Sequence, residues 1–142
     1  MSRIFWDTNV FIYLFEKHPV HHAEVVRLRT KMLKRGDELL TSWLTVGEVQ
    51  VQATATSKRT SSAPYRDAIV SSSSLLVFAE DAANSYRDLR NATTVKGPDA
   101  LQLACAAASG VELFVTNDKK LHGLRISGIH FIASIAAAEA LL

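Results

Sequence analysis

The sequence predicts an α/β fold: a three-layer α/β/α sandwich around a mainly parallel five-stranded sheet. Short apolar segments recur along the 142-residue chain, and longer segments with helical character separate them. Parallel strands require crossover connections, which helices supply, and these helices cover both faces of the sheet. Hydrophobic residues make up 48% of the chain, enough to fill the core of one ordinary domain. We therefore expect residues 1–142 to fold as a single domain.

The first part of the chain is expected to hold strands over residues 3–6 and 39–41 and helices over residues 10–15, 19–35 and 44–55. Asp7 supplies a cap for the first helix, Pro19 suits the first turn of the second, and Gly36 ends it. Ser42 can cap the third helix. The alternation of apolar and polar residues over 49–53 also fits a strand, so the sequence leaves helix and strand open there.

The second part is expected to hold strands over residues 75–78, 113–116 and 129–132 and helices over residues 65–70, 81–91, 99–109 and 135–142. Pro64 marks a helix start after a segment rich in Ser, Lys and Arg, and Gly110 closes the helix over 99–109. That helix is apolar on nearly all sides, which predicts that it is buried. Asn117 and Asp118 begin a turn or short helix after the fourth strand.

Four carboxylates stand where strands end or helices begin, and sheets of this kind bind ligands at the carboxyl ends of their strands. These acids are Asp7, Glu48, Asp99 and Asp118. Taken singly, each has a structural explanation as a turn or cap residue. Glu48 ends a Thr-x-x-Glu capping box, and Asp99 with Gln102 resembles a capping pair.

Glu48 argues against a purely structural role. On a helix over 44–55 it would share one face with Leu44, Val51 and Ala55. An ionised carboxylate buried on that apolar face would be costly unless it were paired or bound to a metal. Several acids at one edge of a sheet also repel one another, so a site of this kind would require a divalent cation.

The available donors favour Mg²⁺ or Mn²⁺, hard ions that prefer carboxylate oxygens. Cys105 is the only cysteine, so the chain has no multi-cysteine zinc site and no internal disulfide. His18 and His22 stand four residues apart and could bind Zn²⁺, but a proline between them disturbs the helix start. His122 and His130 are expected to be structural.

The charge distribution favours a polyanionic partner. The chain carries 16 Lys and Arg against 14 Asp and Glu; without the four acids, 16 basic residues face 10 acidic ones, which leaves +6 on the rest of the surface. A negative pocket inside a basic exterior suits a polyanion held over bound metal. No apolar run approaches the roughly 20 residues that span a bilayer, and the N-terminus lacks a signal-peptide layout. A soluble, cytoplasmic protein without membrane contact is therefore expected.

Four segments resemble the PIN domain family and, within it, the VapC-type ribonuclease toxins of toxin–antitoxin systems. They are residues 3–9, 41–48, 97–104 and 114–121, which occur in the family's order and cover nearly the whole chain. The resemblance implies an endoribonuclease that hydrolyses RNA phosphodiester bonds at an acidic Mg²⁺ or Mn²⁺ site. It also implies the α/β/α sandwich, a small cognate antitoxin as partner, and a homodimer.

The family's acidic quartet carries over onto the same four acids, and its supporting hydroxyl onto Thr116. Asp7 and Asp99 are assigned as the principal metal ligands, while Glu48 and Asp118 complete the site directly or through water. Thr116 is expected to position a carboxylate or a metal-bound water. Substrate contacts are assigned to Thr8, Asn9, Lys96, Lys119 and Lys120, with turn chemistry and a solvated surface as the structural alternatives.

Residues 56–69, with Tyr65 among Lys58, Arg59 and Arg66, are a candidate antitoxin or RNA surface, although a mobile basic loop would explain their composition equally. Two other functions stay open. An aspartate after the first strand suits an aspartyl-phosphate phosphotransferase, but Asn9 stands where such a site needs a second Asp. A non-catalytic, acid-lined binding module is the other alternative.

Overall fold

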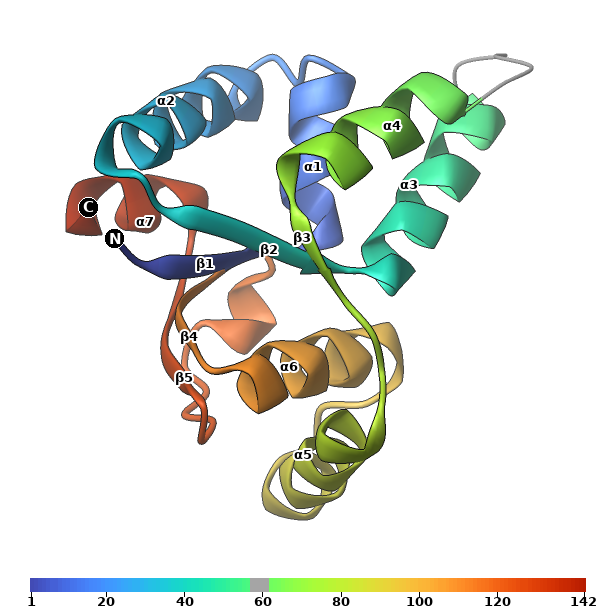
Figure 1. Cartoon of the computed structure of the whole chain (residues 1–142), viewed down its shortest axis with the longest axis vertical. Helices are drawn as coiled ribbons and strands as arrows, with labels where there is room; N and C mark the ends of the chain where they lie inside the picture. The colour runs from blue at the N-terminus through green and yellow to red at the C-terminus, as the bar shows by residue number, and fades with distance from the viewer. Residues whose placement is uncertain (57–61) are drawn as a thin grey trace.

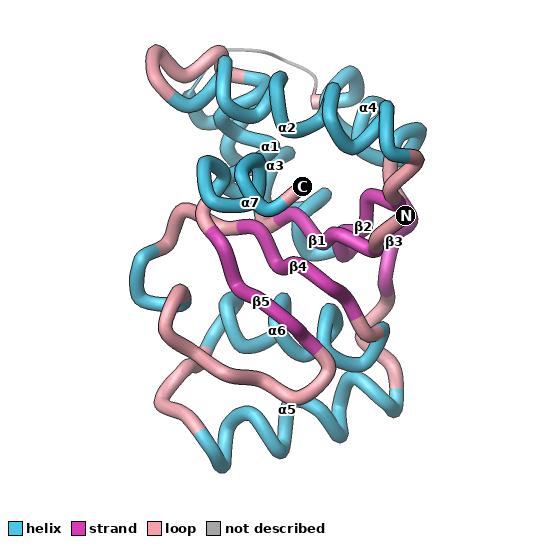
Figure 2. Tube along the Cα trace, turned by 90° about the vertical axis from the view of Figure 1, so that its left-hand side faces the viewer, coloured by secondary structure: helices cyan, strands magenta, loops and turns pink. Residues whose placement is uncertain are grey.

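The computed structural model describes residues 1–56 and 62–142, which form a parallel five-stranded sheet with helices on both faces (Figures 1 and 2). The strands are β1 (Arg3–Trp6), β2 (Glu38–Ser42), β3 (Ser74–Leu76), β4 (Val111–Val115) and β5 (Ile129–Ala133). Their order across the sheet is β3-β2-β1-β4-β5, and all four neighbouring pairs are parallel. The predicted α/β fold class is confirmed.

The helices are α1 (Thr8–Phe15), α2 (His21–Arg35), α3 (Trp43–Thr56), α4 (Ala63–Ser72), α5 (Glu80–Ala92), α6 (Gly97–Ser109) and α7 (Ile135–Leu141), with a short 3₁₀ helix over Lys119–Leu121. Figure 1 shows α5 and α6 beneath the sheet and the other α-helices above it. Each face of the sheet therefore has its own hydrophobic core, and the sheet with the two groups of helices forms three layers.

Alternation along the central strands supplies both cores. Ile4 and Trp6 of β1 face the helices above the sheet, whereas Phe5 between them faces α5 and α6. Phe5 stacks on Phe114 of β4, with ring centroids 4.9 Å apart. Because central parallel strands are covered on both faces, they read as continuous apolar runs in the sequence.

Most predicted boundaries differ from the structure by one or two residues. Helix α2 begins at His21 rather than Pro19, because Nδ1 of His18 accepts hydrogen bonds from the backbone N–H groups of Val20 (3.2 Å) and His21 (3.1 Å). Strand β3 ends at Leu76, opposite the last residue of β2, and leaves Val77 and Phe78 outside the sheet. Helix α6 begins two residues before Asp99, at Gly97.

Residues 43–56 form helix α3, which decides between the helix and the strand that the sequence left open. Lys58 and Arg59 of the candidate basic surface lie outside the described residues. The ring of Tyr65 in the same region packs on Phe15 of α1, with centroids 5.0 Å apart. Within residues 1–56 and 62–142, no helix is long and apolar enough to cross a membrane.

Candidate active site

Asp7 lies at the carboxyl end of the central strand β1. Its Oδ1 accepts a hydrogen bond from the backbone N–H of Thr8 (2.8 Å) and so caps α1. Its Oδ2 accepts the hydroxyl proton of Thr116 (2.8 Å), which follows β4. The backbone N–H of Asp7 also donates to the carbonyl oxygen of Val115 (3.0 Å). The two central strands therefore hold this carboxylate in one position, and it is only 6% exposed.

Burial raises the pKa of Asp7 from its ordinary 3.8 to about 6. The hydrogen bonds from Thr116 and Thr8 oppose this rise, because they favour the ionised carboxylate, whereas the negative charges of Asp99 and Glu48 add to it. These two acids, from α6 and α3, are therefore close enough to Asp7 to repel its charge. For Glu48 a contact agrees with this, because it accepts a hydrogen bond from Thr8, the neighbour of Asp7.

Asp99 is the third residue of α6 and lies in its first turn. The capping explanation for Asp99 is wrong, because the N-cap of α6 is Lys96. The side chain of Lys96 makes no capping hydrogen bond. Burial raises the pKa of Asp99, the charge of Asp118 raises it further, and the charge of Lys120 lowers it. Asp118 is therefore close enough to Asp99 to affect its ionisation.

Asp118 does cap a helix, as the sequence suggested. Its Oδ1 accepts the backbone N–H of Lys120 (3.1 Å) at the start of the 3₁₀ helix. The backbone N–H of Asp118 donates to Oγ1 of Thr116 (3.1 Å), the hydroxyl that also holds Asp7. Thr116 is fully buried. Because its hydroxyl bonds both Asp7 and Asp118, it links the positions of these two acids.

Glu48 accepts a hydrogen bond on Oε1 from the hydroxyl of Thr8 (2.7 Å). The predicted apolar face around Glu48 is wrong, because Val51 on that face is 69% exposed. The buried face of α3 carries instead Thr45, Val46, Val49 and Ala53. Glu48 is half-buried beside this face, and its position follows from the hydroxyl of Thr8 rather than from burial among apolar side chains.

A polar network that the sequence did not reveal lies beneath the acids. Gln102 is 1% exposed, and its Nε2 donates to Oγ1 of Thr45 (2.6 Å) and to Oγ1 of Thr8 (3.2 Å). Its Oε1 accepts the hydroxyl of Ser42, the residue expected to cap α3. Thr41 donates to Thr45 from β2 (2.8 Å). The one signal in the sequence was a glutamine inside a helix that is otherwise nearly all apolar.

Gln102→Leu is expected to lower the free energy of unfolding by about 1–3 kcal/mol, because it leaves buried hydroxyls without their partner. Urea unfolding followed by circular dichroism measures this loss. The control is Asn84→Leu at an exposed position of α5, which should stay within about 0.5 kcal/mol of the parent protein. Equal losses in both variants would show that the network carries no special stability.

Two asparagines complete the scaffold of the site. Nδ2 of Asn9 donates to Oγ1 of Thr116 (3.1 Å), and its Oδ1 accepts the backbone N–H of Asn117 (3.3 Å). Oδ1 of Asn117 in turn accepts the backbone N–H of Ile135 at the start of α7. These bonds join the ends of β1, β4 and β5, and Asn117 had been predicted only as a turn residue.

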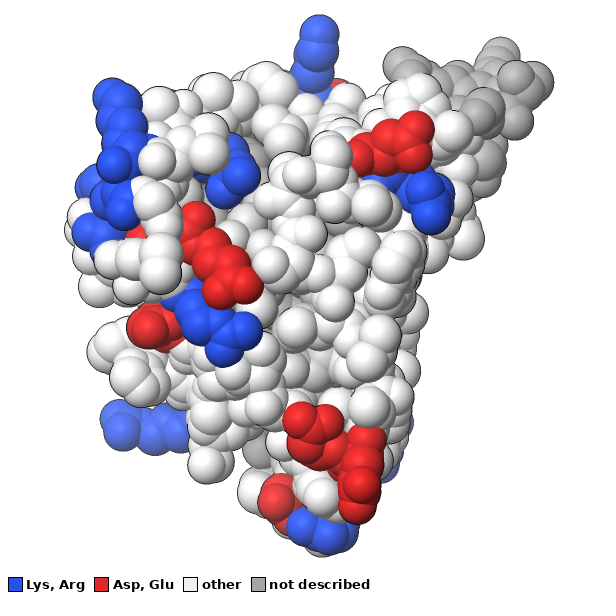
Figure 3. All heavy atoms as spheres, viewed as in Figure 1, with Lys and Arg blue, Asp and Glu red and all other residues white. Residues whose placement is uncertain are grey.

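The three lysines assigned to substrate contact are all exposed: Lys96, Lys119 and Lys120. The charge of Lys120 reaches Asp99, as its effect on the pKa of that acid shows. Figure 3 shows the face that carries β3, where basic side chains gather over α2, acidic ones gather at the start of α5, and a mixed group of acidic and basic side chains lies left of the centre. The basic exterior expected from composition is therefore absent from this face.

The donor set of the site consists of oxygen atoms and fits a hard divalent cation, which would offset the burial and the charge repulsion that raise the pKa values of Asp7 and Asp99. Among the described residues, no three His, Cys, Asp or Glu side chains close around one point. A hydrated ion held by one or two carboxylates suits this spacing, since Mg²⁺ keeps several of its waters. The two histidines considered for Zn²⁺ contact the backbone through their Nδ1 atoms. Nδ1 of His22 lies 2.9 Å from the carbonyl oxygen of Leu14, and Nδ1 of His18 accepts hydrogen bonds from two backbone N–H groups.

Comparison with known proteins gives a family and a set of similar structures. The PIN domain model matches residues 4–126. A VapBC2 structure from Rickettsia felis, bound to a DNA fragment from its promoter, has a TM-score of 0.72 at 20% identity and covers 93% of this chain and 98% of that chain. A DNA-bound VapBC from Salmonella typhimurium has a TM-score of 0.65 at 24% identity, with 95% and 99% covered. Likeness at these identities shows the fold.

A toxin–antitoxin complex from Klebsiella pneumoniae has a TM-score of 0.64 at 26% identity and covers 89% of this chain and 94% of that chain. No curated protein matches the sequence.

Proposed function

Because this chain belongs to the PIN domain family, we propose that it is a metal-dependent endoribonuclease, the VapC-type toxin of a type II toxin–antitoxin system. The observation that carries the proposal is the convergence of four acids from separate segments at the carboxyl edge of the sheet. Burial raises the pKa of Asp7 most, and the charges of Asp99 and Glu48 add to it; burial likewise raises the pKa of Asp99 most, and the charge of Asp118 adds to it. A protein without a cation to bind gains nothing from this repulsion.

Asp7 and Asp99 would hold the Mg²⁺ or Mn²⁺ ion, with Glu48 and Asp118 acting directly or through water. The bound ion would acidify a water molecule and neutralise the phosphate that it attacks. With a pKa near 6, Asp7 is largely ionised at neutral pH and is available as a ligand. Thr116 acts through Asp7, because its hydroxyl holds Oδ2 and sets the direction of the carboxylate.

Thr8 and Asn9, which the sequence assigned to the substrate, fit a positioning role in this proposal. The hydroxyl of Thr8 donates to Glu48, and the side-chain amide of Asn9 donates to Thr116. Phosphate contacts fall to the exposed lysines Lys96, Lys119 and Lys120. A phosphotransferase fits less well, because both carboxylate oxygens of the buried Asp7 already accept hydrogen bonds.

The partner proposed for this chain is a small cognate antitoxin, supported by the toxin–antitoxin complex from Klebsiella pneumoniae. A homodimer is proposed from family membership alone. The substrate is proposed to be RNA in the cytoplasm.

RNA cleavage by the purified chain tests the proposal. With Mg²⁺ or Mn²⁺ the protein is expected to cut single-stranded RNA, and Asp99→Asn is expected to lower the rate more than about 100-fold, since even partners behind metal ligands are worth 10- to 100-fold. The matched control is Asp88→Asn, an exposed acid paired with Arg87 on α5. If the parent protein cuts no RNA with either metal, and its expression is as harmless to growth as that of Asp99→Asn, the proposed function is wrong.

A further inference from the structure

A groove runs beside β5, the strand at one edge of the sheet. Figure 2 shows the segment before β5 passing alongside this strand on the exposed side. The groove has a volume of about 570 Å³ and is lined by residues of this segment and of β5 itself, among them His122, Arg125, His130 and Phe131. Among the described residues that line it, none is acidic.

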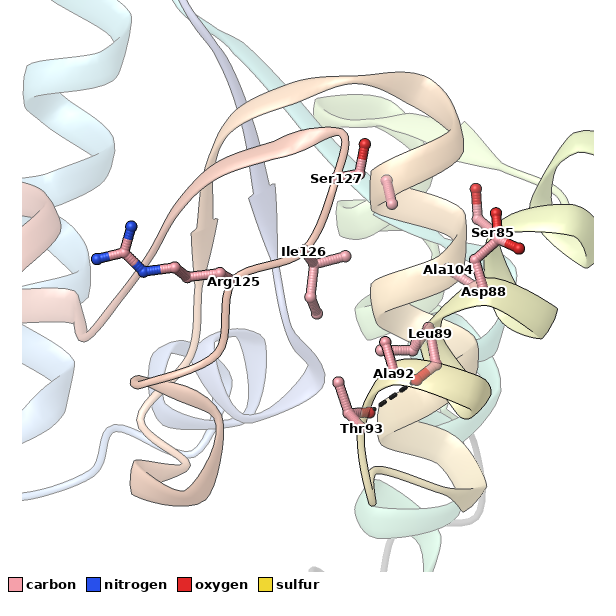
Figure 4. Close-up of a pocket in the computed structure, with 10 residues that line it drawn as sticks. Ser85, Asp88, Leu89, Ala92, Thr93, Ala104, Arg125, Ile126 and Ser127 are labelled. Atoms are coloured by element: carbon pink, nitrogen blue, oxygen red, sulfur yellow. Dashed lines mark hydrogen bonds between the residues drawn. The ribbon is translucent and has the colours of Figure 1, made fainter.

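Arg125 supplies a free positive charge to this groove. Its side chain is exposed and forms no ion pair within the part of the chain that the structure describes. Figure 4 shows its guanidinium pointing away from the cavity between α5 and α6, while the neighbouring Ile126 points into that cavity. Both residues line the small cavity, about 180 Å³, as well as the larger groove.

The wall of the groove is anchored at both ends. At its start, Nε2 of His122 lies 2.7 Å from the carbonyl oxygen of Thr116. At its end, Gly128 has φ +96°, and a Cβ atom there would lie 2.2 Å from the carbonyl oxygen of Ala107 on α6. Only glycine fits this close approach. Between these points Leu124 and Ile126 pack on the core beneath the sheet. The segment that forms the wall of the groove is therefore held in place by the rest of the fold.

His122, at the start of the groove, contacts Thr116, which also binds Asp7. Thr116 holds Asp7 through its hydroxyl and meets His122 through its carbonyl oxygen. Between Thr116 and His122 in the sequence lie Lys119 and Lys120, two exposed lysines in the turn that Asp118 caps. The charge of Lys120 acts on Asp99. Lys119 and Lys120 therefore lie in the turn that joins Asp118 to the groove segment with Arg125.

We propose, on the basis of the ribonuclease function proposed above, that this groove binds a single-stranded segment of the RNA beside the bond that is cut. Lys119, Lys120 and Arg125 contact its phosphates, and Phe131 stacks on a base. Phe131 is 61% exposed, unusual for an aromatic residue on a strand, and it lines the groove. Cations that follow a backbone, together with an exposed aromatic ring, are the features by which proteins bind single-stranded nucleic acids. None of the described residues that line the groove is an acid that would repel the phosphates.

RNA binding without cleavage tests the groove. In an Asp7→Asn background without divalent ions, fluorescence anisotropy with a labelled 12-nucleotide single strand gives the dissociation constant over a series of salt concentrations. Arg125→Gln is expected to weaken binding and to reduce the slope of log K against log salt by about 0.7, the contribution of one phosphate contact on a single strand. Phe131→Ala is expected to weaken binding at least about 5-fold with the slope unchanged.

The matched controls are residues that do not line the groove. Arg87→Gln removes an exposed arginine of α5 that is paired with Asp88, and Phe78→Ala removes a half-exposed aromatic ring after β3. Both should leave affinity and slope unchanged, and circular dichroism melts check that all variants are folded.

Three outcomes would overturn the inference. If Arg125→Gln and Phe131→Ala bind RNA as the background protein does while the parent chain cuts RNA, the groove proposal is wrong and the ribonuclease function stands. If the two variants keep RNA affinity but lose affinity for the antitoxin, the groove belongs to the protein partner. If the background protein does not bind RNA and the parent chain does not cut it, the proposed function falls together with the groove.

Discussion

Asp7→Asn is expected to abolish RNA cleavage and, at pH 8, to make the protein more stable. The pKa of Asp7 is raised in the folded state to about 6, so the folded protein binds this proton more tightly than the unfolded chain does. The stability that results is fully present below about pH 4 and is lost as the pH rises through 6. A shift of this size corresponds to about 3 kcal/mol, as an order of magnitude. Asparagine carries no charge to bury at any of these pH values.

Urea unfolding at pH 4 and pH 8 measures the effect. The parent protein should lose stability between the two pH values, and Asp7→Asn should lose about 3 kcal/mol less. Asp88→Asn, which changes an exposed acid, should follow the parent. Cleavage by Asp7→Asn should fall more than about 100-fold at every pH. The same pH dependence in the parent and in Asp7→Asn would show that burial does not raise the pKa of this carboxylate.

Divalent cations are expected to raise the free energy of unfolding, because they offset the unfavourable burial and repulsion of the acids. At pH 8, Mg²⁺ at about 100 times its dissociation constant should stabilise the parent protein by about 2.7 kcal/mol, because the ion binds the folded state and not the unfolded one. Chelation should remove both this increment and the cleavage of RNA. Asp99→Asn should lose most of the increment, since half of the principal ligand pair is gone.

The increment separates site binding from general salt effects. Asp88→Asn should gain as much from Mg²⁺ as the parent does, and Na⁺ at equal ionic strength should give neither protein the gain. Equal stabilisation of the parent, Asp88→Asn and Asp99→Asn by Mg²⁺ would show that the ion does not bind at the acids.

Local sequence signals predicted the frame of the molecule well. Apolar runs marked the strands, because central parallel strands are buried on both faces. Gly36 ends α2 in the left-handed conformation, and Asp7 and Asp118 cap the elements that follow them. Each of these features depends on residues that are near one another in the chain. Errors arose where a distant segment took part, as at the end of β3, which stops where β2 stops.

The sequence argument for Glu48 was wrong, and its role in the site stays a prediction. The predicted apolar stripe around it is solvent-exposed at Val51, because the packing of α3 buries a different face. What places Glu48 is the hydroxyl of Thr8, forty residues away in the chain. Helical periodicity alone does not tell which side of a helix meets the sheet.

The α/β fold, the family and the four candidate acids could be predicted from the sequence, because strand pattern, caps and motif order are recorded in short stretches of chain. The positions of those acids relative to one another, and the residues that hold them, depend on how the chain folds. Thr116 and Gln102 join segments far apart in the sequence, and the pKa of Asp7 rises because folding buries it beside Asp99 and Glu48. Burial and charge repulsion act through space, and the spacing of residues along the chain does not record them.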